Sequence, residues 1–598
     1  MGESRARASA FRRLPAGTAL LAAFAPLQAQ TLPDAPRPPT REEVERQRPR
    51  PPERREPRLT VEGAVERAPC ALDQSGDIRF TLRSVEFGGL RGLAADALRP
   101  AFEPFVGADQ PISVICEIRD RAATILRDAG YVAAVEIPEQ RISAGTVRFE
   151  VLLAKLVAVR VRGDAGRAER TIARYLERLQ GREVFNRDEA ERYLLLAGDL
   201  PGYDVRLALR SAGAGRGEVI GEVTVVRTPA ILEANVQNFG SNELGRWGGM
   251  VRGEAYGLTG LGDRTVIALF STADLSEQQT LQIGHDMRVG GEGLTLAGRF
   301  TYAWANPELT DPTLDVEART LLATVEASYP LLRTQSASAW AAAGLDLIDQ
   351  DVRINGLPLS RDRLRVAFVR LDLEGADRAS FGRAGGYSAA EPRLRAAASL
   401  ELRKGLGLFG ASEDCGPAFA RCTAPGAVPP SRLEGDAAAA VVRFQGSFEY
   451  RAVPALTAAL GLRAQYSGRP LLSFEEFSAG NYTAGRGYDP GTLLGDNGVG
   501  IQAELRYGSL VPSAPRDAAV QPFVFFDLAR VSNEDRAFPV AGGKRLSSVG
   551  GGVRAAFGQG ATLEVSLAVP LERAGLLAKK PDPRLLVSLT TRLWPWSF

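Results

Sequence analysis

Hydrophobic and polar residues alternate at every second position through most of the chain after about Ile231. A representative segment has apolar residues at Val442, Phe444, Phe448 and Tyr450 and polar residues between them at Arg443, Gln445, Ser447 and Glu449. Similar segments begin near Leu456 and near Val499. A period of two is that of a β-strand with one apolar face and one polar face. The pattern therefore predicts a sheet whose two faces meet different surroundings.

The length of these segments indicates what those surroundings are. The segments run for about 9 to 13 residues, whereas strands of soluble proteins average about 5 to 6 and a tilted strand crosses a bilayer in about 9 to 11. A sheet in lipid must close, because an open edge would leave backbone N–H and C=O groups without partners. We count about sixteen segments, in which short turns alternate with longer loops. Residues 229–598 are thus predicted to form a transmembrane β-barrel of about 16 antiparallel strands with a polar, wet lumen.

Two units of about 75 residues precede this region and resemble each other. The repeat is visible at matched positions: Val85, Phe87 and Gly89 recur as Val159, Val161 and Gly163, Gly130-Tyr131 recurs as Gly202-Tyr203, and Gly145 recurs as Gly217. Each unit is predicted to be β-α-α-β-β, with Asn186 as an N-cap and Glu189 at N3 in the second. We therefore predict small α+β domains at residues 69–153 and 154–228. The alternative is two ordinary α+β domains without a shared role.

The N-terminal residues have the composition of an export signal followed by an arm. Residues 1–29 contain a basic stretch, an apolar run from Leu14 to Leu27 and a small-residue cleavage site at Ala29, which is typical of a signal peptide. Residues 30–68 are rich in Pro, Arg and Glu, so we expect an arm or linker. Within it, Thr40 could cap a short helix over Arg41–Gln47; the alternative is a tether without structure.

The composition excludes several classes of function. Charged residues make up 24% of the 598 residues and the formal net charge is only +2, so nucleic acid is not an expected partner. The single histidine, His285, and the absence of a Cys-x-x-Cys pair argue against a zinc site and against most acid–base enzymes. The sequence has no glycine-rich loop followed by lysine, which is the motif that would indicate a nucleotide-binding site. We expect no metal, no cofactor and no enzymatic activity.

Four cysteines follow the export signal, and disulfides are permitted in exported proteins. Cys70 and Cys116 could join the end of the arm to the first small domain. Cys415 and Cys422 could close a small loop in a stretch rich in Gly, Pro and Ala.

Two motifs resemble a known family. The stretch Phe474-Glu475-Glu476-Phe477-Ser478-Ala479-Gly480 is followed by Gly485-Arg486-Gly487-Tyr488, and Phe523-Val524-Phe525-Phe526-Asp527 lies further on. They resemble the sixth-loop and strand signatures of outer-membrane proteins with POTRA domains. With two POTRA-like repeats, the chain is most similar to the two-partner secretion transporters, which export haemolysin and filamentous haemagglutinin. The resemblance covers about Pro69 to Phe598.

The resemblance implies a particular arrangement inside the barrel. The long loop is expected to fold back into the lumen, where Arg486 meets Asp527 on the wall and Gly487 allows the backbone to approach it, with Tyr488 next to this contact. The family usually has a β-branched residue where this chain has Gly485, so we expect a less stiff loop tip and the same pairing. We expect four further residues to face the lumen: Arg463, Gln502, Glu504 and Arg506.

The function implied by the resemblance is export. The chain would be an outer-membrane pore that recognises and secretes a large partner exoprotein with an N-terminal secretion domain, without ATP. The POTRA-like domains would lie in the periplasm, where chaperones are further candidate partners, and the arm would plug the lumen at rest. Two alternatives remain open: an assembly factor for outer-membrane proteins, and a passive porin whose small domains serve as an anchor.

Overall fold

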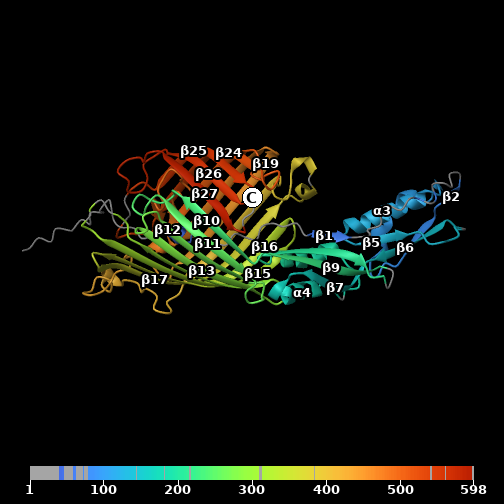
Figure 1. The fold of residues 1–598 in the computed structure, drawn as a ribbon, viewed down its shortest axis with the longest axis horizontal. Helices are drawn as coiled ribbons and strands as arrows, with labels where there is room; N and C mark the ends of the chain where they lie inside the picture. The colour runs from blue at the N-terminus through green and yellow to red at the C-terminus, as the bar shows by residue number, and fades with distance from the viewer. Residues whose placement is uncertain are drawn as a thin grey trace, which may run out of the picture. The chain divides into compact units, whose positions relative to one another are not determined.

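The computed structural model describes residues 39–45, 58–61, 70, 72, 78–142, 144–180, 182–213, 217–308, 311, 313–382, 384–538, 542–558 and 560–595. The predicted signal peptide, residues 1–29, and most of the predicted arm lie outside the described residues. The small domains and the barrel follow one another along the chain, blue to green and green to red in Figure 1.

The predicted closed barrel of sixteen antiparallel strands is confirmed, because the first strand pairs with the last through Gln237 and Ser588. The strands are β10 (Ala230–Gln237), β11 (Gly248–Tyr256), β12 (Arg264–Thr272), β13 (Gln278–Val289), β14 (Leu294–Ala305), β15 (Val316–Arg333), β16 (Ala337–Ile354), β17 (Leu357–Ala376), β18 (Leu394–Gly405), β19 (Ala440–Val453), β20 (Leu456–Ser467), β23 (Asn497–Tyr507), β24 (Ala518–Ser532), β25 (Arg545–Phe557), β26 (Ala561–Pro570) and β27 (Arg584–Trp594).

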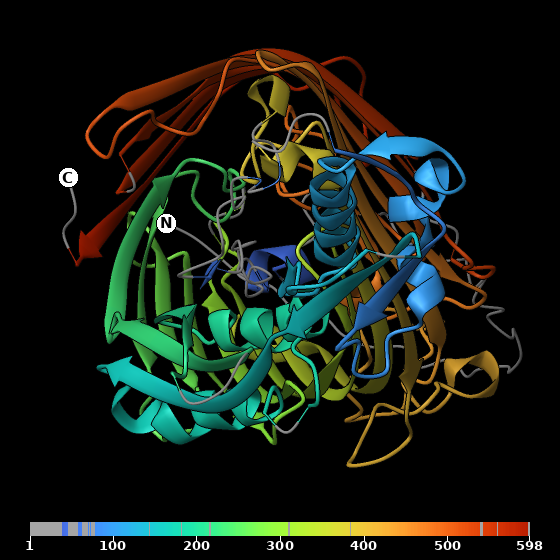
Figure 2. The same cartoon turned by 90° about the vertical axis from the view of Figure 1, so that its right-hand side faces the viewer.

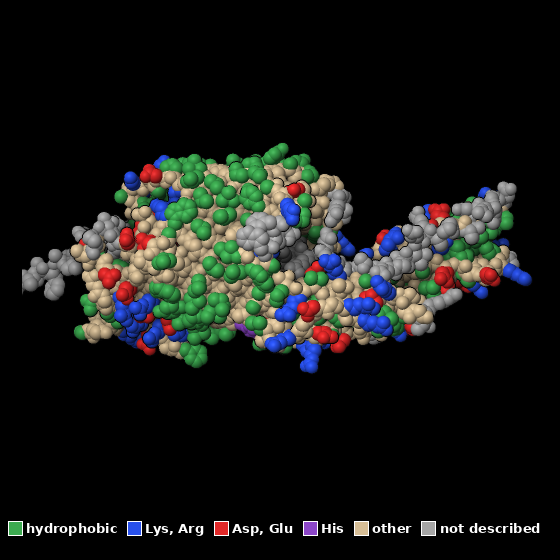
Figure 3. Space-filling model, viewed as in Figure 1, with side chains coloured by type: hydrophobic (Ala, Val, Ile, Leu, Met, Phe, Trp, Pro, Cys, Tyr) green, Lys and Arg blue, Asp and Glu red, His purple; other side chains and the backbone are tan. Residues whose placement is uncertain are grey.

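The outer wall of the barrel is apolar, as Figure 3 shows for one side. Val442 and Phe448 are exposed on the outside, while Arg443 between them in sequence is buried on the inside. Aromatic side chains lie near both ends of this apolar band: Trp304 and Tyr466 near one end, and Tyr329, Tyr450 and Tyr507 near the other. Such aromatic girdles mark the two interfaces of a membrane.

The strands and their connections depart from the expected regularity. β15, β16 and β17 have 18, 18 and 20 residues, which is more than a bilayer needs. The β16–β17 connection is only Asn355-Gly356, and both residues have positive φ, as a two-residue hairpin turn requires. We call the rim that carries this turn the far rim. At the opposite rim, which we call the domain-side rim, residues 377–393 form a long connection where a short turn was expected.

The expected polar lining does not extend over the whole inner wall. Leu322, Ile348, Leu364 and Val366 form an apolar patch on the inner wall of β15, β16 and β17. This patch is not wet, because Val44 of the arm and Leu472 and Phe474 of a long loop cover it. Strand alternation fails where a second layer of protein, rather than water, meets the inner face.

The first small domain is a three-stranded sheet under helices. Strands β3 (Ser84–Gly88), β6 (Thr146–Leu153) and β5 (Ala133–Glu136) lie in that order, and α3 (Val114–Asp128) buries Ile115, Ile118, Ala122 and Leu126 against them. The remaining elements are β2 (Arg79–Thr81), η1 (Ala95–Leu98), α2 (Arg99–Phe102), η2 (Glu103–Phe105) and β4 (Asp109–Pro111). A disulfide joins Cys70 to Cys116 of α3.

The second small domain repeats this plan with β7 (Lys155–Gly163), η3 (Gly166–Ala168), α4 (Glu169–Glu177), α5 (Arg187–Gly198), β8 (Tyr203–Ser211) and β9 (Glu218–Arg227). Asn186 caps α5 as predicted, but the Glu189 side chain pairs with Arg182. The repeated glycines have a common cause: Gly89 and Gly163, Gly130 and Gly202, and Gly145 and Gly217 all have positive φ.

The sheet of the second domain also contains a strand that the sequence did not predict. β1 (Arg58–Val61), within the predicted arm, pairs in parallel with β8, so the sheet order is β1-β8-β9-β7. The second domain contacts the domain-side rim through a bidentate ion pair between Arg333 and Asp199, at 2.7 Å for each bond. Both side chains are buried. Among the described residues, no helix is long and apolar enough to cross a membrane.

Candidate functional site

The connection between β20 and β23, residues 468–496, lies inside the barrel. We call it the lumen loop. It contains a short turn, η7 (Ser473–Glu475), and a hairpin of β21 (Phe477–Ala479) with β22 (Leu493–Gly495). Nearly all of its residues from Leu471 to Tyr488 are buried, polar ones included. A loop this polar is buried only where the barrel wall supplies hydrogen-bond partners.

The tip of the lumen loop is fixed by Arg486. Its Nε and Nη2 donate to Oδ2 and Oδ1 of Asp527 on β24, at 3.0 and 2.7 Å. Its backbone N–H donates to the same carboxylate at 2.9 Å, and Nη1 donates to Glu504 on β23 at 2.6 Å. The guanidinium lies 3.7 Å from the ring centroid of Phe525. Every nitrogen group of Arg486 is thus engaged by the wall.

The Arg486–Asp527 pair fixes the position of the loop tip more than it stabilises the folded barrel. The Asp527 side chain is 0% exposed and that of Arg486 is 9% exposed, so both charges have left water. Burial alone would lower the pKa of Arg486, but Asp527 and Glu504 raise it above its usual value, and the side chain stays charged. The desolvation cost of such a pair offsets much of its attraction, whereas its bidentate geometry permits one placement of the loop tip.

Two glycines allow this placement. A Cβ on Gly487 would lie 2.8 Å from the backbone nitrogen of Pro570, so a side chain would push the tip off the wall. Gly485 has φ +120°, and a Cβ there would lie 2.5 Å from Leu546. The residue at which this chain departs from the family pattern therefore has a backbone conformation that favours glycine. Its N–H donates to Asp527 at 3.3 Å.

Tyr488 extends the contact between the lumen loop and the barrel wall to β25 and to the residues just after β26. Its ring is fully buried, and its hydroxyl donates to the carbonyl of Glu572 at 2.8 Å and lies 3.0 Å from that of Ser547.

The four other predicted lumen residues face inward but are already bound. Gln502 donates to the carbonyl of Thr483 in the lumen loop at 2.6 Å, and Arg463 donates to Glu42 of the arm at 2.9 Å. Glu504 accepts bonds from Arg486, Arg506 and Arg554, and Arg506 also reaches Glu449 at 2.7 Å. In this structure the wall residues hold the lumen's contents in place.

Sequence reasoning missed the role of Glu475. Its carboxylate lies between Arg403 and Arg443 of the wall, at 2.8 and 2.7 Å. It therefore anchors the start of the lumen loop, as Arg486 anchors its tip. The signal was present: two adjacent glutamates flanked by phenylalanines suggest carboxylates that enter an interior.

A second missed residue, Arg432, joins three loops at the far rim. It donates to Glu476 of the lumen loop at 2.9 Å and to Asp496 at 2.5 Å, and it pairs with Asp535 between β24 and β25. Arg432 belongs to the connection between β18 and β19, residues 406–439, which we call the rim loop. This stretch has no periodic pattern, so nothing in the sequence marked the residue.

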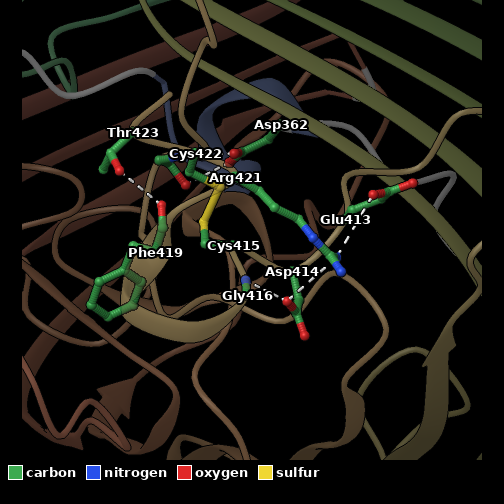
Figure 4. Close-up of a disulfide and its surroundings, with 10 residues drawn as sticks. Asp362, Glu413, Asp414, Cys415, Gly416, Phe419, Arg421, Cys422 and Thr423 are labelled. Carbon is green, nitrogen blue, oxygen red and sulfur yellow. Dashed lines mark hydrogen bonds and ion pairs between the residues drawn. A yellow bond between two sulfur atoms is a disulfide. The ribbon is translucent and has the colours of Figure 1, made fainter. Parts of the chain in front are cut away.

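The rim loop carries the second disulfide, Cys415–Cys422, shown in Figure 4. Arg421 lies between Glu413 and Asp414, 3.9 Å from each, and Thr423 donates to the carbonyl of Phe419 at 3.0 Å. Further along the loop, Ser431 donates to Asp362 of β17 from both its backbone and its hydroxyl. The disulfide closes a small turn of a loop that is fixed to the barrel elsewhere.

The short helix considered for the arm is present as α1 (Arg41–Val44), and it ends earlier than expected, with Glu45 as its C-cap. Thr40 and Glu43 form a reciprocal capping box. Figure 2 shows α1, in dark blue, within the ring of strands, where Val44 packs on the apolar patch and its carbonyl accepts a bond from Gln282 at 3.0 Å. Burial would raise the pKa of Glu42, but Arg41 and Arg463 hold it below its ordinary value.

Among the described residues, no group of three or more His, Cys, Asp or Glu side chains could hold a metal ion. The chemistry that the site offers is ionic and steric: two segments fill a lumen and are fixed by arginine–carboxylate contacts.

Known proteins share this arrangement of a barrel and small domains. The family model for the haemolysin secretion/activation proteins ShlB/FhaC/HecB matches residues 222–555, and that for the POTRA domain of ShlB type matches residues 80–153. The fold resembles CdiB from Escherichia coli, with a TM-score of 0.67, 17% identity, and coverage of 86% of this chain and 91% of that one. For CdiB from Acinetobacter baumannii the TM-score is 0.58, with 13% identity and coverage of 86% and 90%.

A curated relative is the heme/hemopexin transporter protein HuxB of Haemophilus influenzae, 23% identical over 211 residues. The match covers 34% of this chain and 37% of that protein, so the chain spans little more than a third of the relative's length. Because the first family model covers more than half of the sequence, the chain belongs to the haemolysin secretion/activation protein family ShlB/FhaC/HecB.

Proposed function

We propose that this protein exports one large partner polypeptide across the outer membrane through its barrel, without a nucleotide. The observation that carries the proposal is a lumen loop fixed by Arg486 to Asp527 and Glu504 inside a sixteen-stranded barrel, in a chain that belongs to a secretion family. The proposed division is a signal peptide at 1–29, an arm at 30–68, POTRA domains at 69–153 and 154–228, and the barrel at 229–598.

The domain-side rim would face the periplasm. The second POTRA domain contacts that rim, and the rim loop with the disulfide Cys415–Cys422 lies at the far rim. Both disulfides suit an oxidising compartment outside the inner membrane. Periplasmic chaperones would then meet the POTRA domains, and the partner would leave at the far rim.

Capture of the partner would use strand pairing. β1 of the arm already binds the edge of β8 through backbone pairing over four residues, from Arg58 with Arg206 to Val61 with Leu209. This edge therefore accepts an extended segment with little demand on its side chains. A segment of the partner's N-terminal secretion domain would bind β8 in place of β1, or bind the outer edge of β7, which pairs with no further strand among the described residues.

Passage through the lumen would require α1 to leave. α1 and the lumen loop meet over the apolar patch. On the wall, Arg463 binds α1 and Gln502 binds the lumen loop. The departure of α1 would free Arg463, while Gln502 and Glu504 would stay bonded to the lumen loop. An extended chain would then pass a polar, mixed-charge surface formed by Arg463, Gln502, Glu504 and Arg506 together with that loop.

Arg486→Ala tests this function. We expect secretion of the partner to fall at least about tenfold while a heat-modifiable barrel remains in the outer membrane, since the loop tip loses its anchor. The matched control is Arg530→Ala, on the same strand as Asp527 but exposed on the outside. Normal secretion by the Arg486 variant would refute the role of the loop.

Cross-linking from the POTRA domains in cells separates export from the two alternatives. A single large exoprotein as the captured chain supports export, whereas nascent barrel proteins would indicate an assembly factor. Solute flux that persists after deletion of residues 75–227, with no secretion defect, would indicate a porin.

A further inference from the structure

We propose that the outer face of β15, β16 and β17 at the far rim binds a phosphorylated glycolipid of the surrounding membrane leaflet. This surface lies on the outside of the barrel, and lipid binding there does not depend on export. The three strands are unusually long and continue past the apolar band.

One face of β17 changes abruptly from apolar to basic. Leu373, Leu371 and Val369 are exposed on the outer wall. The next outward positions toward the far rim are Ala367, Arg365, Arg363 and Arg361. At about 3.3 Å per residue, the three arginines cover roughly 13 Å along the strand, beginning where the apolar band ends. This is the depth at which the charged groups of lipid headgroups lie.

Neighbouring strands extend the basic surface. Register places Arg361 beside Asp351 and Arg363 beside Asp349 on β16, and it places Asp351 beside Arg319 on β15. The outward positions within the strands, Lys404 of β18 included, have six cations, Arg319, Arg353, Arg361, Arg363, Arg365 and Lys404, and three carboxylates, Glu317, Asp349 and Asp351, which leaves three positive charges. Arg365 is buried, and Asp315, just before β15, adds one exposed carboxylate at this rim.

The surplus is located on particular residues. Arg365 pairs with Asp349 at 2.7 Å, Arg361 with Asp351 at 2.6 Å, and Arg319 with Glu317 at 3.3 Å. Arg353, Arg363 and Lys404 have no carboxylate partner within the described part of the chain. A gathering of Lys and Arg side chains is visible in Figure 3, close to where Figure 1 labels β17. Cations beside lipid favour phosphate groups, which they bind by charge and hydrogen bonds.

The apolar and aromatic neighbours favour a glycolipid over a simple phospholipid. The ring centroids of Tyr302 and Trp304 lie 5.7 Å apart on the outer wall. Together with Asn306, Glu317 and Arg319, these two residues line a hollow of about 260 Å³. Aromatic faces beside polar groups suit the apolar face and the hydroxyls of a sugar ring. Phe409 of the rim loop is 73% exposed, and its carbonyl accepts a bond from Arg365, so an apolar side chain lies next to the cations.

The test measures binding of lipid A to the full-length protein in detergent by native mass spectrometry. The cluster variant is R353Q/R363Q/K404Q, and the matched control is R536Q/K544Q/R573Q, which removes three exposed cations from far-rim loops. For bisphosphorylated lipid A we expect about tenfold or more weaker binding by the cluster variant and no change in the control. The monophosphorylated form should bind the wild type less tightly, and Trp304→Ala should lower affinity for lipid A more than for phosphatidylglycerol.

Equal binding of bisphosphorylated lipid A by the wild type and the cluster variant would overturn the proposal, as would an equal loss in the control. Heat-modifiable migration reports folding of both variants. If the cluster variant does not fold, the affinity of the wild-type protein for lipid A is measured at low and high salt. An affinity that does not fall at high salt would also overturn the proposal. A cluster variant that keeps lipid A but loses secretion would indicate a polypeptide ligand instead, and would leave the export proposal intact.

Discussion

The lumen loop and α1 both fill the barrel, yet they are held in different ways. The lumen loop is covalently continuous with the wall at both ends, and it is fixed at its start by Glu475 and at its tip by Arg486. No buried side-chain polar atom of residues 474–496, all of which the structure describes, lacks a hydrogen-bond partner. In α1, by contrast, Nη1 of Arg41 and Oε2 of Glu42 are buried without a hydrogen-bond partner among the described residues.

This difference indicates which segment is built to move. Orphaned polar atoms cost free energy in the interior that they regain in water, so removal of α1 is less unfavourable than removal of a fully satisfied loop. α1 is also too short to be a stable helix by itself and depends on its capping box and its surroundings. We therefore expect the lumen loop to act as a fixed part of the channel and α1 as a removable plug.

The largest expected effect is on the fixed element. Asp527→Ala leaves Arg486 buried without its main partner, which should destabilise the folded barrel by about 3 to 5 kcal/mol. The urea midpoint of the heat-modifiable form in detergent measures this loss. Asp372→Ala, which removes a 38% exposed carboxylate from a pair with Arg370, should cost no more than about 1 kcal/mol. Similar midpoints for the two variants would show that the loop tip is not specially anchored.

An intermediate effect is expected on the removable element. Arg463→Ala removes the wall's ion pair with Glu42, and a charged hydrogen bond contributes about 1.5 kcal/mol, so the unplugged fraction should rise roughly tenfold without loss of barrel stability. Single-channel conductance in planar bilayers measures that fraction. The control is Arg299→Ala, which removes an ion pair with Glu326 of the wall and leaves the Arg463–Glu42 pair in place. Unchanged conductance would place α1 among the fixed parts.

The smallest effect should appear on acidification. Arg41 and Arg463 lower the pKa of Glu42 from its ordinary value of 4.5, despite the opposing effect of burial. A carboxylate whose pKa is lower in the folded state contributes stability that is complete above its ordinary pKa and is lost as pH falls through the lowered value. Channel opening should therefore be constant from pH 7 to about 5 and rise below about 4.5. Glu42→Gln should raise the opening at neutral pH and remove this dependence.

The fold could be predicted from the sequence because its dominant signals are local. Period-two alternation in segments as clear as Val442 to Tyr450 determines strand, face and surroundings together. The repeated glycines signalled two small domains, since each pair occupies a positive φ. The Arg486–Asp527 pairing came from resemblance alone, because nothing in the spacing of two residues 41 apart predicts that they meet.

What the sequence did not reveal depends on contacts between distant segments. In the sequence Arg432 is a single cation in a Gly- and Pro-rich stretch, and nothing near it indicates its role. Its partners Glu476 and Asp535 lie on other loops. The apolar inner patch at Leu364 and Val366 breaks the alternation that locates strands. β1 consists of four residues in a Pro- and Arg-rich arm, and only the edge of β8 gives them a strand conformation.

We expect the arm's second attachment, β1, to determine how readily a displaced α1 returns to the lumen. While β1 is paired, residues 46–57 join α1 to the POTRA sheet, so a displaced α1 is confined near the lumen at a high effective concentration. If an incoming segment displaces β1, the next attachment is Cys70, held by its disulfide to Cys116, and the connecting stretch doubles to residues 46–69. Doubling the stretch lowers the effective concentration of α1 roughly threefold, or by about 0.6 kcal/mol. Occupation of β8 would thus slow reclosure of the channel without any contact between the bound segment and α1.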